Sequence, residues 1–289
     1  RDGIQEDERT GGKKVSARGL ELLDSGNKKR KGKAPVFYEI TLNTARHTAE
    51  DLQLIKSILL DYPGKMACTI FTAGCNMRCP FCHNSRLVIN PSGESEFSEE
   101  EILAYLKKRQ GILEGVAITG GEPLMRKDLA DVGEALYKRG YPWGMVTNGL
   151  ALTEDRFRRL RKAGLRSITI SLDGLEDDHV WLRQHPLAFE GACRAIRLCA
   201  AERDLAWDVV TCVNQRTINK LPEIRDLLWS MGVRNWRVFG IDPMGRAAEN
   251  EELILTDEQF QYLMEFIVSE RQAGRHVSYS CEGFLGDYE

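Results

Sequence analysis

The chain has 289 residues, enough to bury the core of one large domain or two small ones. Its 40 basic and 43 acidic residues leave a formal net charge of −3, which gives no support for nucleic-acid or membrane binding driven by bulk charge. Because no apolar run could span a bilayer and no signal-peptide pattern is seen, we expect a cytoplasmic protein with no nucleic-acid or membrane partner.

The first 34 residues are polar and include a basic run, KKRKGK, at 28–33. A basic run can bind nucleic acid, but no aromatic residue is interleaved here and acidic residues lie nearby. The composition is more typical of a solvated, flexible arm. We therefore predict an N-terminal arm or extension over residues 1–54 and a core domain over residues 55–289.

Short apolar segments alternate with helical patterns through the rest of the chain. Strands are predicted at 66–74, 115–121, 143–149, 166–174, 206–214 and 234–243. Helices are predicted at 98–110, 127–140, 153–164, 187–203, 218–232 and 256–274, with Ser98 and Thr153 as N-caps of the first and third. Six strand–helix units with short connections predict an α/β fold with a parallel sheet, and favour a partial (β/α)6 barrel.

Residues able to bind ligands follow four of the predicted strands. Because the carboxyl ends of parallel strands share one face, we expect these residues to form a single site. They are Cys75, Cys79 and Cys82 after the first strand, Gly120, Gly121 and Glu122 after the second, Thr147 and Asn148 at the end of the third, and Ser171 and Asp173 at the end of the fourth.

Three of the eight cysteines are clustered in the stretch AGCNMRCPFCHN, residues 73–84, with the spacing C-x3-C-x2-C. A structural zinc site needs four ligands, and His83 is badly placed to complete one because it directly follows Cys82. Three thiolates are better suited to a metal site with one open position. A [4Fe–4S] cluster held by three cysteines has such a position, and Phe81 would shield it from water.

This cysteine spacing, together with GGEP at 120–123, resembles the radical S-adenosylmethionine (radical SAM) superfamily over roughly residues 55–285. The resemblance implies a partial (β/α)6 barrel and a [4Fe–4S] cluster bound by Cys75, Cys79 and Cys82. It also implies that the open iron chelates the amino and carboxylate groups of SAM. Reductive cleavage of SAM would then give methionine and a 5′-deoxyadenosyl radical, which abstracts hydrogen from a substrate.

The other strand-end residues would hold SAM. The paired glycines would let the ligand approach backbone carbonyls, and the glutamate would face the ammonium group. Ser171 and Asp173 would hold the carboxylate and ribose of SAM, or merely cap a helix. Arg183, in HVWLRQ, would pair with the SAM carboxylate unless it lies at the surface. The cofactor-binding residues predicted in this way are Gly120, Gly121, Glu122, Thr147, Asn148, Ser171, Asp173 and Arg183. Residues 241–247, IDPMGRA, resemble the adenine-side loop of the family.

The two halves of the chain resemble different branches of the superfamily. Residues 60–140, including CHN at 82–84, are similar to activating enzymes of the anaerobic ribonucleoside-triphosphate reductase, which install a glycyl radical. Residues 143–285, with VTNG, ISLDG and FGIDPMGRA, are similar to peptide- or protein-modifying enzymes that continue into a cysteine-rich SPASM domain. The cysteines of such a domain are not in this chain, which is either truncated before it or works without it.

Both branches imply a peptide or protein substrate and an electron donor such as flavodoxin or ferredoxin. Two alternatives stay open. One is glycyl-radical activation of the anaerobic reductase, and the other is a non-catalytic metal-binding module.

Overall fold

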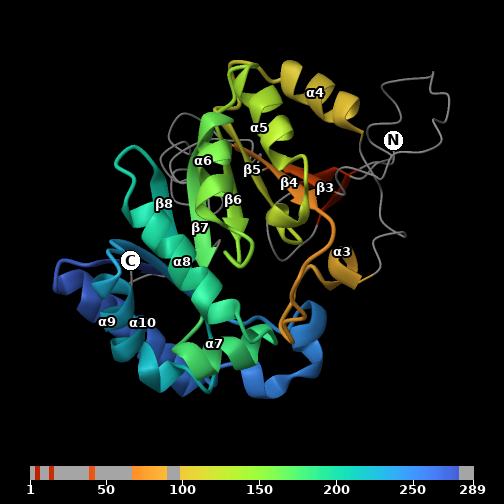
Figure 1. Cartoon of the computed structure of the whole chain (residues 1–289). Helices are drawn as coiled ribbons and strands as arrows, with labels where there is room; N and C mark the ends of the chain where they lie inside the picture. The colour runs from red at the N-terminus through yellow and green to blue at the C-terminus, as the bar shows by residue number, and fades with distance from the viewer. Residues whose placement is uncertain (1–3, 7–12, 16–38, 43–66, 90–97, 280–289) are drawn as a thin grey trace.

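The computed structural model describes residues 4–6, 13–15, 39–42, 67–89 and 98–279. Its sheet has ten strands whose order in space follows their order in the chain. The last seven run parallel to one another, and the first three are antiparallel to their neighbours. Strands β3 (Glu39–Leu42) to β8 (Ala206–Val213) are labelled in Figure 1. The parallel strands are β4 (Ala67–Thr72), β5 (Gly115–Gly120), β6 (Trp143–Thr147), β7 (Leu165–Ser171), β8 (Ala206–Val213), β9 (Asn235–Gly240) and β10 (His276–Tyr279).

A helix follows each of the first six parallel strands, so the six predicted units and the α/β partial barrel are confirmed. Helices α5 (Leu129–Tyr137), α6 (Glu154–Lys162) and α8 (Ala188–Ala200) lie over the middle strands in Figure 1 and contact β6 or β7. Strand β10 is a seventh parallel strand that the hydrophobic pattern did not reveal. The helices are α3 (Ser85–Ile89), α4 (Glu99–Lys107), α5 (Leu129–Tyr137), α6 (Glu154–Lys162), α7 (Glu176–Arg183), α8 (Ala188–Ala200), α9 (Leu221–Ser230) and α10 (Asp257–Gln272).

Local sequence sets where these helices begin. Ser98 caps α4, and its hydroxyl accepts from the Glu101 backbone while the Glu101 carboxylate accepts from the Ser98 backbone. Thr153 accepts a hydrogen bond from the Arg156 backbone and caps α6. Both predicted caps are confirmed, because a side-chain oxygen satisfies a backbone N–H group that the first helical turn leaves unpaired.

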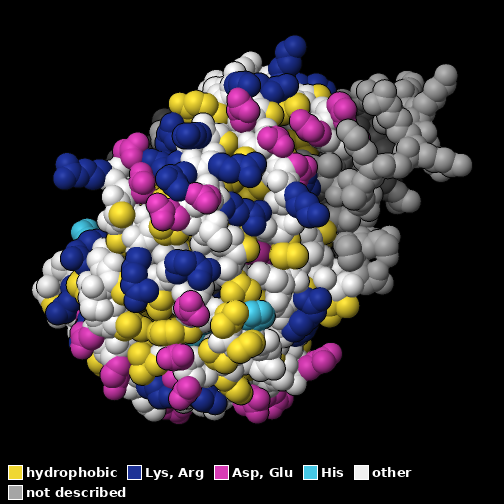
Figure 2. Space-filling model, viewed as in Figure 1, with side chains coloured by type: hydrophobic (Ala, Val, Ile, Leu, Met, Phe, Trp, Pro, Cys, Tyr) yellow, Lys and Arg dark blue, Asp and Glu magenta, His cyan; other side chains and the backbone are white. Residues whose placement is uncertain are grey.

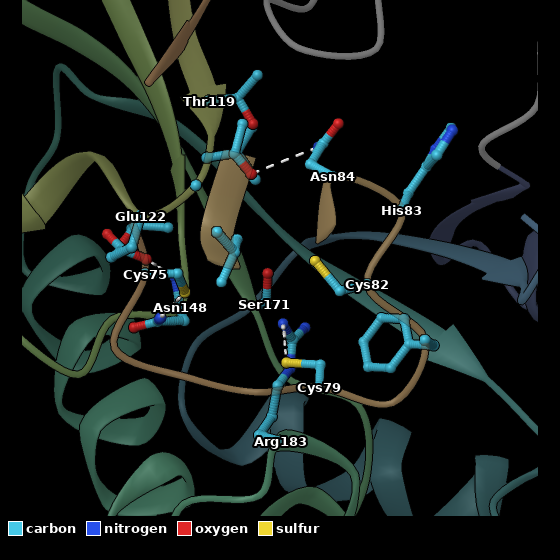
Figure 3. A pocket seen from close by; sticks show the side chains of 16 residues that line it. Cys75, Cys79, Cys82, His83, Asn84, Thr119, Glu122, Asn148, Ser171 and Arg183 are labelled. Atoms are coloured by element: carbon cyan, nitrogen blue, oxygen red, sulfur yellow. Dashed lines mark hydrogen bonds between the residues drawn. The ribbon is translucent and has the colours of Figure 1, made fainter. Parts of the chain in front are cut away.

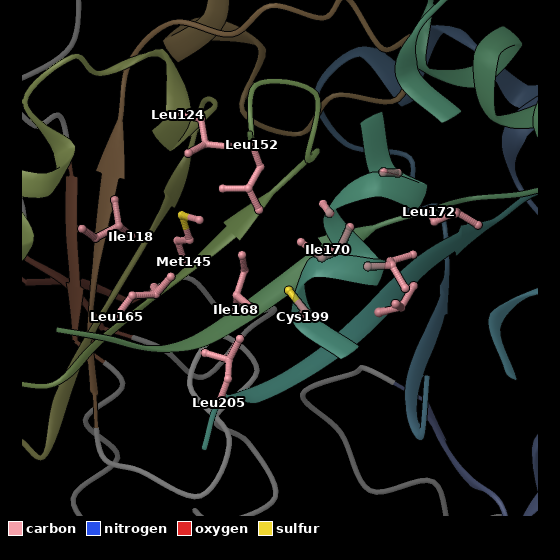
Figure 4. Close-up of a cluster of buried hydrophobic side chains, with 14 of the residues drawn as sticks. Ile118, Leu124, Met145, Leu152, Leu165, Ile168, Ile170, Leu172, Cys199 and Leu205 are labelled. Atoms are coloured by element: carbon pink, nitrogen blue, oxygen red, sulfur yellow. The ribbon is translucent and has the colours of Figure 1, made fainter. Parts of the chain in front are cut away.

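Alternating side chains on the strands separate the core from the site. Ile118, Met145 and Ile170 point into the apolar layer between sheet and helices, which Figure 4 shows. Their sequence neighbours Thr119, Val146 and Ser171 lie on the opposite face, at the strand ends, where they line a pocket. Because the three apolar side chains are buried in this layer, their three sequence neighbours point toward the pocket.

The described parts of the predicted N-terminal arm extend the sheet. Strand β3 (Glu39–Leu42) pairs with β4 at four positions, from Glu39 opposite Phe71 to Leu42 opposite Cys68. Strands β1 (Ile4–Glu6) and β2 (Lys13–Val15) continue the ribbon outward. This pairing satisfies the open backbone edge of β4, which a fully flexible arm would leave exposed. The remaining arm residues and the predicted boundary at residue 54 lie outside the described residues.

The surface carries mixed charge, as the near balance of basic and acidic residues predicts. On the face in Figure 2, Lys and Arg side chains are interspersed with Asp and Glu. Within the described part of the chain, no helix combines the length and the apolar character needed to cross a membrane.

Candidate active site

One pocket of about 170 Å³ lies at the carboxyl ends of β4 to β7 (Figure 3). It brings together most of the residues that the sequence predicted as a single site. Those lining it are Cys75, Cys79, Cys82, Gly120, Gly121, Glu122, Thr147, Asn148, Ser171 and Arg183. Asn84, Thr119, Val146 and Val88 also line it and were not predicted. Thr119 and Val146 share a strand face with Ser171, so strand alternation could have identified them.

The loop after β4 carries the three thiols into this pocket. It turns at Gly74, whose backbone N–H donates to the Leu87 carbonyl at 2.9 Å. Cys75 receives a 3.4 Å contact from the Met77 backbone N–H, and Cys82 N donates to the Cys79 carbonyl at 3.2 Å. Cys79 is buried, whereas Cys75 and Cys82 are half-buried. All three are free cysteines.

The thiols fit an iron–sulfur cluster better than a single metal ion. Among the described residues, no three Cys, His, Asp or Glu side chains are close enough together to hold one ion. In Figure 3 the His83 ring points away from the three cysteines, which disfavours the zinc alternative. A four-iron cluster takes one thiolate on each of several irons, so its cysteines stand further apart than the ligands of one ion. Burial raises the pKa of Cys75 to about 11, and ligand binding must remove that proton.

Glu122 ties the strand ends together. It is only 2% exposed, and its carboxylate accepts from Thr147 Oγ1 at 2.6 Å, from Asn148 N at 2.8 Å and from Leu124 N at 3.0 Å. Burial raises the pKa of Glu122, although these hydrogen bonds oppose that shift. The Glu122 carboxylate, predicted to face the SAM ammonium group, thus hydrogen-bonds to the loop after β5 and to the end of β6.

The paired glycines bind the cysteine loop directly. Gly121 N donates to the Thr72 carbonyl at 2.7 Å, and Glu122 N donates to the Gly74 carbonyl at 2.8 Å. A Cβ atom on Gly121 would stand 2.1 Å from the Gly74 carbonyl oxygen. The glycine loop and the cysteine loop are therefore joined backbone to backbone. Glycine is required here because the two backbones touch.

Asp173 does not line the pocket, so its predicted contact with the SAM carboxylate or ribose does not match its position. It is fully buried, accepts from Arg183 Nε and accepts from Cys212 N at 3.0 Å. Burial alone would raise the pKa of Asp173, but the Arg183 guanidinium and the neighbouring His179 hold it well below its ordinary value. The sequence spacing does not reveal that Asp173 forms an ion pair with Arg183.

Arg183 forms an ion pair with Asp173 and lines the pocket. Its side chain is 11% exposed, so the surface alternative was wrong. Its guanidinium lies 3.9 Å from Cys79 Sγ through Nη1 and 5.1 Å from the centroid of the Phe81 ring. A buried cation thus stands beside one of the three thiols, anchored from behind by Asp173. Within residues 241–247, which resemble the adenine-side loop of the family, Arg246 donates to backbone carbonyls of the cysteine loop.

Comparison with known proteins gives a consistent family match. The sequence model of the radical SAM superfamily matches residues 69–228, more than half of the chain. The chain is 29% identical over 188 residues to an AdoMet-dependent heme synthase of Methanosarcina barkeri, covering 64% of this chain and 53% of that protein. It is 26% identical over 219 residues to a PqqA peptide cyclase of Bradyrhizobium diazoefficiens, covering 74% and 54% respectively. The chain thus spans about half the length of these curated relatives.

Solved structures share the fold. One of anSMEcpe with bound AdoMet has a TM-score of 0.57 at 18% identity, covering 72% of this chain and 61% of that one. One of Streptococcus suis SuiB bound to the precursor peptide SuiA has a TM-score of 0.56 at 13% identity, covering 91% and 59%.

Proposed function

Because the chain belongs to the radical SAM superfamily, whose members bind a [4Fe–4S] cluster and S-adenosylmethionine, we propose that it cleaves SAM reductively and abstracts hydrogen from a peptide or protein. The observation that carries the proposal is the pocket in which Cys75, Cys79 and Cys82 meet the Gly120–Gly121 turn and Ser171. When bound, the reduced cluster and SAM supply the hydrogen-abstracting chemistry.

The chain's own residues bind and orient these groups. The three thiols, once deprotonated, hold the cluster. The backbone at Gly120 and Gly121 and the Ser171 hydroxyl form the pocket wall against which SAM binds. Glu122 fixes Thr147 and Asn148, and Asn148 in turn donates to Asn76 Oδ1 at 2.8 Å on the cysteine loop. Both SAM-side strand ends and the cluster loop are therefore held in one hydrogen-bonded unit.

A polypeptide substrate is supported by several similar proteins. A PqqA peptide cyclase is among the sequence relatives, and anSMEcpe and SuiB have been solved with peptides. The electron needed for cleavage would come from a small donor such as flavodoxin or ferredoxin. The first half's resemblance to glycyl-radical activating enzymes stays a prediction, since the relatives named above are of other kinds.

A heme precursor is a second candidate substrate. AdoMet-dependent heme synthases from several organisms and an Fe-coproporphyrin III synthase match at 25–29% identity. The match to the peptide cyclase lies within the same range. The two substrate classes are therefore compared directly by experiment.

The test begins with anaerobic reconstitution by iron and sulfide. We expect a brown protein whose visible absorbance is bleached by dithionite and which converts SAM to 5′-deoxyadenosine. A colourless protein, or one without SAM cleavage, would overturn the enzyme assignment. The substrate class is then tested with fully deuterated tryptic peptides and, separately, with Fe-coproporphyrin III. Deuterium in 5′-deoxyadenosine from the peptides supports a polypeptide substrate, whereas turnover of the porphyrin alone contradicts it.

A further inference from the structure

Residues 245–250, which follow β9, hydrogen-bond to the backbone of the cysteine loop. Residues Gly245–Glu249 form a short 3-10 helix after β9, and Asn250 ends it. Arg246 Nη1 donates to the Cys79 carbonyl at 2.9 Å, and Asn250 Nδ2 donates to the Pro80 carbonyl at 3.1 Å. Arg246 N donates to the Cys82 carbonyl at 3.3 Å. Three carbonyls of residues 79–82, named here the cysteine arc, are thus bound by residues about 170 positions away.

The contact is too close for a side chain at its first residue. Gly245 has a φ of +59°, and a Cβ atom there would lie 2.5 Å from the Cys82 carbonyl oxygen. Asn250 is itself held by a 2.9 Å bond from Nδ2 to the Arg246 carbonyl, so its amide is oriented toward the arc before any ligand binds. The segment is therefore a preformed clamp rather than a loop that happens to lie nearby.

The remaining cysteine is held by a different part of the barrel. Gly74, beside Cys75, accepts from Glu122 N, and Asn76 accepts from Asn148 Nδ2. Those partners follow β5 and β6, whereas the clamp follows β9. The relative position of Cys75 and the cysteine arc thus depends on two separate halves of the sheet.

Arg246 carries a second feature that the backbone contacts do not explain. Its Nη2 is buried and has no hydrogen-bond partner among the described residues. A buried cationic donor without an acceptor is costly, so a negatively charged group bound beside it would be stabilised. The thiolates and sulfides of a bound cluster would supply the missing negative charge.

We propose that Arg246 and Asn250 are positioning residues for the cluster: Asn250 fixes the cysteine arc in the empty protein, and the Arg246 charge stabilises the cluster when it is reduced. The second half of this inference rests on the proposed function, whereas the first concerns the protein without a cluster. A reduced cluster is more negative than an oxidised one, so a nearby cation raises its reduction potential.

The clamp is tested in the iron-free, full-length chain by the rate at which iodoacetamide labels each cysteine. Asn250→Ala removes a neutral donor and leaves the local charge unchanged. We expect labelling of Cys79 and Cys82 to become about fivefold faster, as the loss of one hydrogen bond predicts, with Cys75 unchanged. Fully buried Cys199 reports global unfolding. Asn235→Ala is the matched control, because this amide donates to the Trp207 carbonyl away from the site.

Unchanged labelling of Cys79 and Cys82 in Asn250→Ala would overturn the clamp, as would an equal increase at Cys75. If iodoacetamide labels Cys199 of this variant as fast as Cys79 and Cys82, Asn250→Ser is used instead. The labelling rates of Cys79 and Cys82 are then again compared with that of Cys75. This experiment needs no cluster, so it stands even if reconstitution fails and the proposed function falls.

The charge is tested in the reconstituted protein by redox titration of the cluster's EPR signal. Arg246→Gln removes the charge, and Arg246→Lys keeps it. We expect a lower reduction potential in the glutamine variant only. Arg139→Gln is the control, because that guanidinium binds a helix carbonyl at an exposed position. Loss of iron from the glutamine variant, with retention in the lysine variant, supports the same role. Equal potentials in wild type and both variants would overturn it.

Discussion

The three thiols show how individual residues are prepared for a ligand. Cys75, Cys79 and Cys82 line one pocket, whereas Cys68 and Cys199 are packed in the core with no exposed surface. Burial raises the pKa of Cys68 to about 12. A fully buried thiol with a raised pKa is expected to be unreactive. The cysteines proposed to bind the cluster therefore differ from the core cysteines in that their side chains line the pocket.

Replacing any one of the pocket cysteines by Ala should abolish cluster binding and SAM cleavage. Each thiolate would hold a different iron, so no neighbour can substitute for it. Iron and sulfide analysis after reconstitution measures the effect. Cys199→Ala is the control, and it should keep full iron content while losing only about 1–3 kcal/mol of stability from the core. Full iron content in Cys79→Ala would show that the cluster ligands have been misassigned.

Asp173 allows a prediction about pH. Asp173→Asn should lower the free energy of unfolding by about 3 kcal/mol at neutral pH, because it leaves Arg183 buried without its counter-charge. The pKa of Asp173 is lowered on folding, so its stabilisation is present above the unfolded value near 4 and is lost as pH falls. The gap between wild type and variant should therefore shrink below about pH 4.

Urea unfolding from pH 3 to 7 measures this gap. Asp204→Asn is the matched control, because Asp204 pairs with Arg161 at an exposed position and should contribute less than about 1 kcal/mol. A gap that stays constant down to pH 3 would contradict the assignment of a depressed pKa to Asp173.

At the scale of elements, the site is a set of loops that hold one another. The loop after β5 donates to the Thr72 carbonyl at the end of β4 and to the Gly74 carbonyl in the loop that follows. The segment after β9 donates to the Cys79 carbonyl of the same loop. Strand ends that are adjacent in the sheet bring these loops together, and short backbone contacts then fix them. The chemistry thus depends on glycines at points where two backbones meet.

Gly121→Val should therefore lose both SAM binding and the cluster, in contrast to a residue that contacts SAM alone. The new side chain would collide with the Gly74 carbonyl and displace the chain leading into Cys75. Iron content measures loss of the cluster, and equilibrium dialysis with radiolabelled SAM measures loss of SAM binding. Gly240→Ala is the control, since a Cβ atom at this strand end would meet only ordinary contacts. A Gly121→Val protein with full iron content would show that the two loops move independently.

At the scale of the whole molecule, the order of six strand–helix units and the placement of the site at one sheet edge could be read from the sequence. Apolar runs and Gly or polar residues at their ends carry that information along the chain. Strand β10 could not be found, because HVSY has a single strongly apolar residue, Val277, in the core. The sequence does not reveal that Asp173 pairs with Arg183, or that Arg246 hydrogen-bonds to the cysteine arc, because these contacts join residues from different parts of the chain. Local patterns contain no record of such contacts.

The N-terminal pairing gives a prediction for the whole fold. Deleting residues 1–34 keeps β3, which pairs with β4 along its length, so the sheet edge beside the cysteine loop stays covered. Cluster content and SAM cleavage should then equal those of the full chain. Deleting residues 1–42 removes β3 as well. The exposed backbone edge of β4 should then lower the urea midpoint and promote aggregation, because unpaired edge strands recruit other chains.

The comparison of the two deletions isolates β3 from the rest of the arm. Sedimentation velocity reports aggregation, and iron analysis reports whether the loop at the end of β4 still assembles a cluster. Because β4 leads directly from the β3 pairing into Gly74 and Cys75, loss of the edge strand should reduce iron content before the core unfolds. If the shorter deletion already loses the cluster, residues 1–34 contribute to the site. If the longer one behaves as the full chain, β4 needs no partner on that edge.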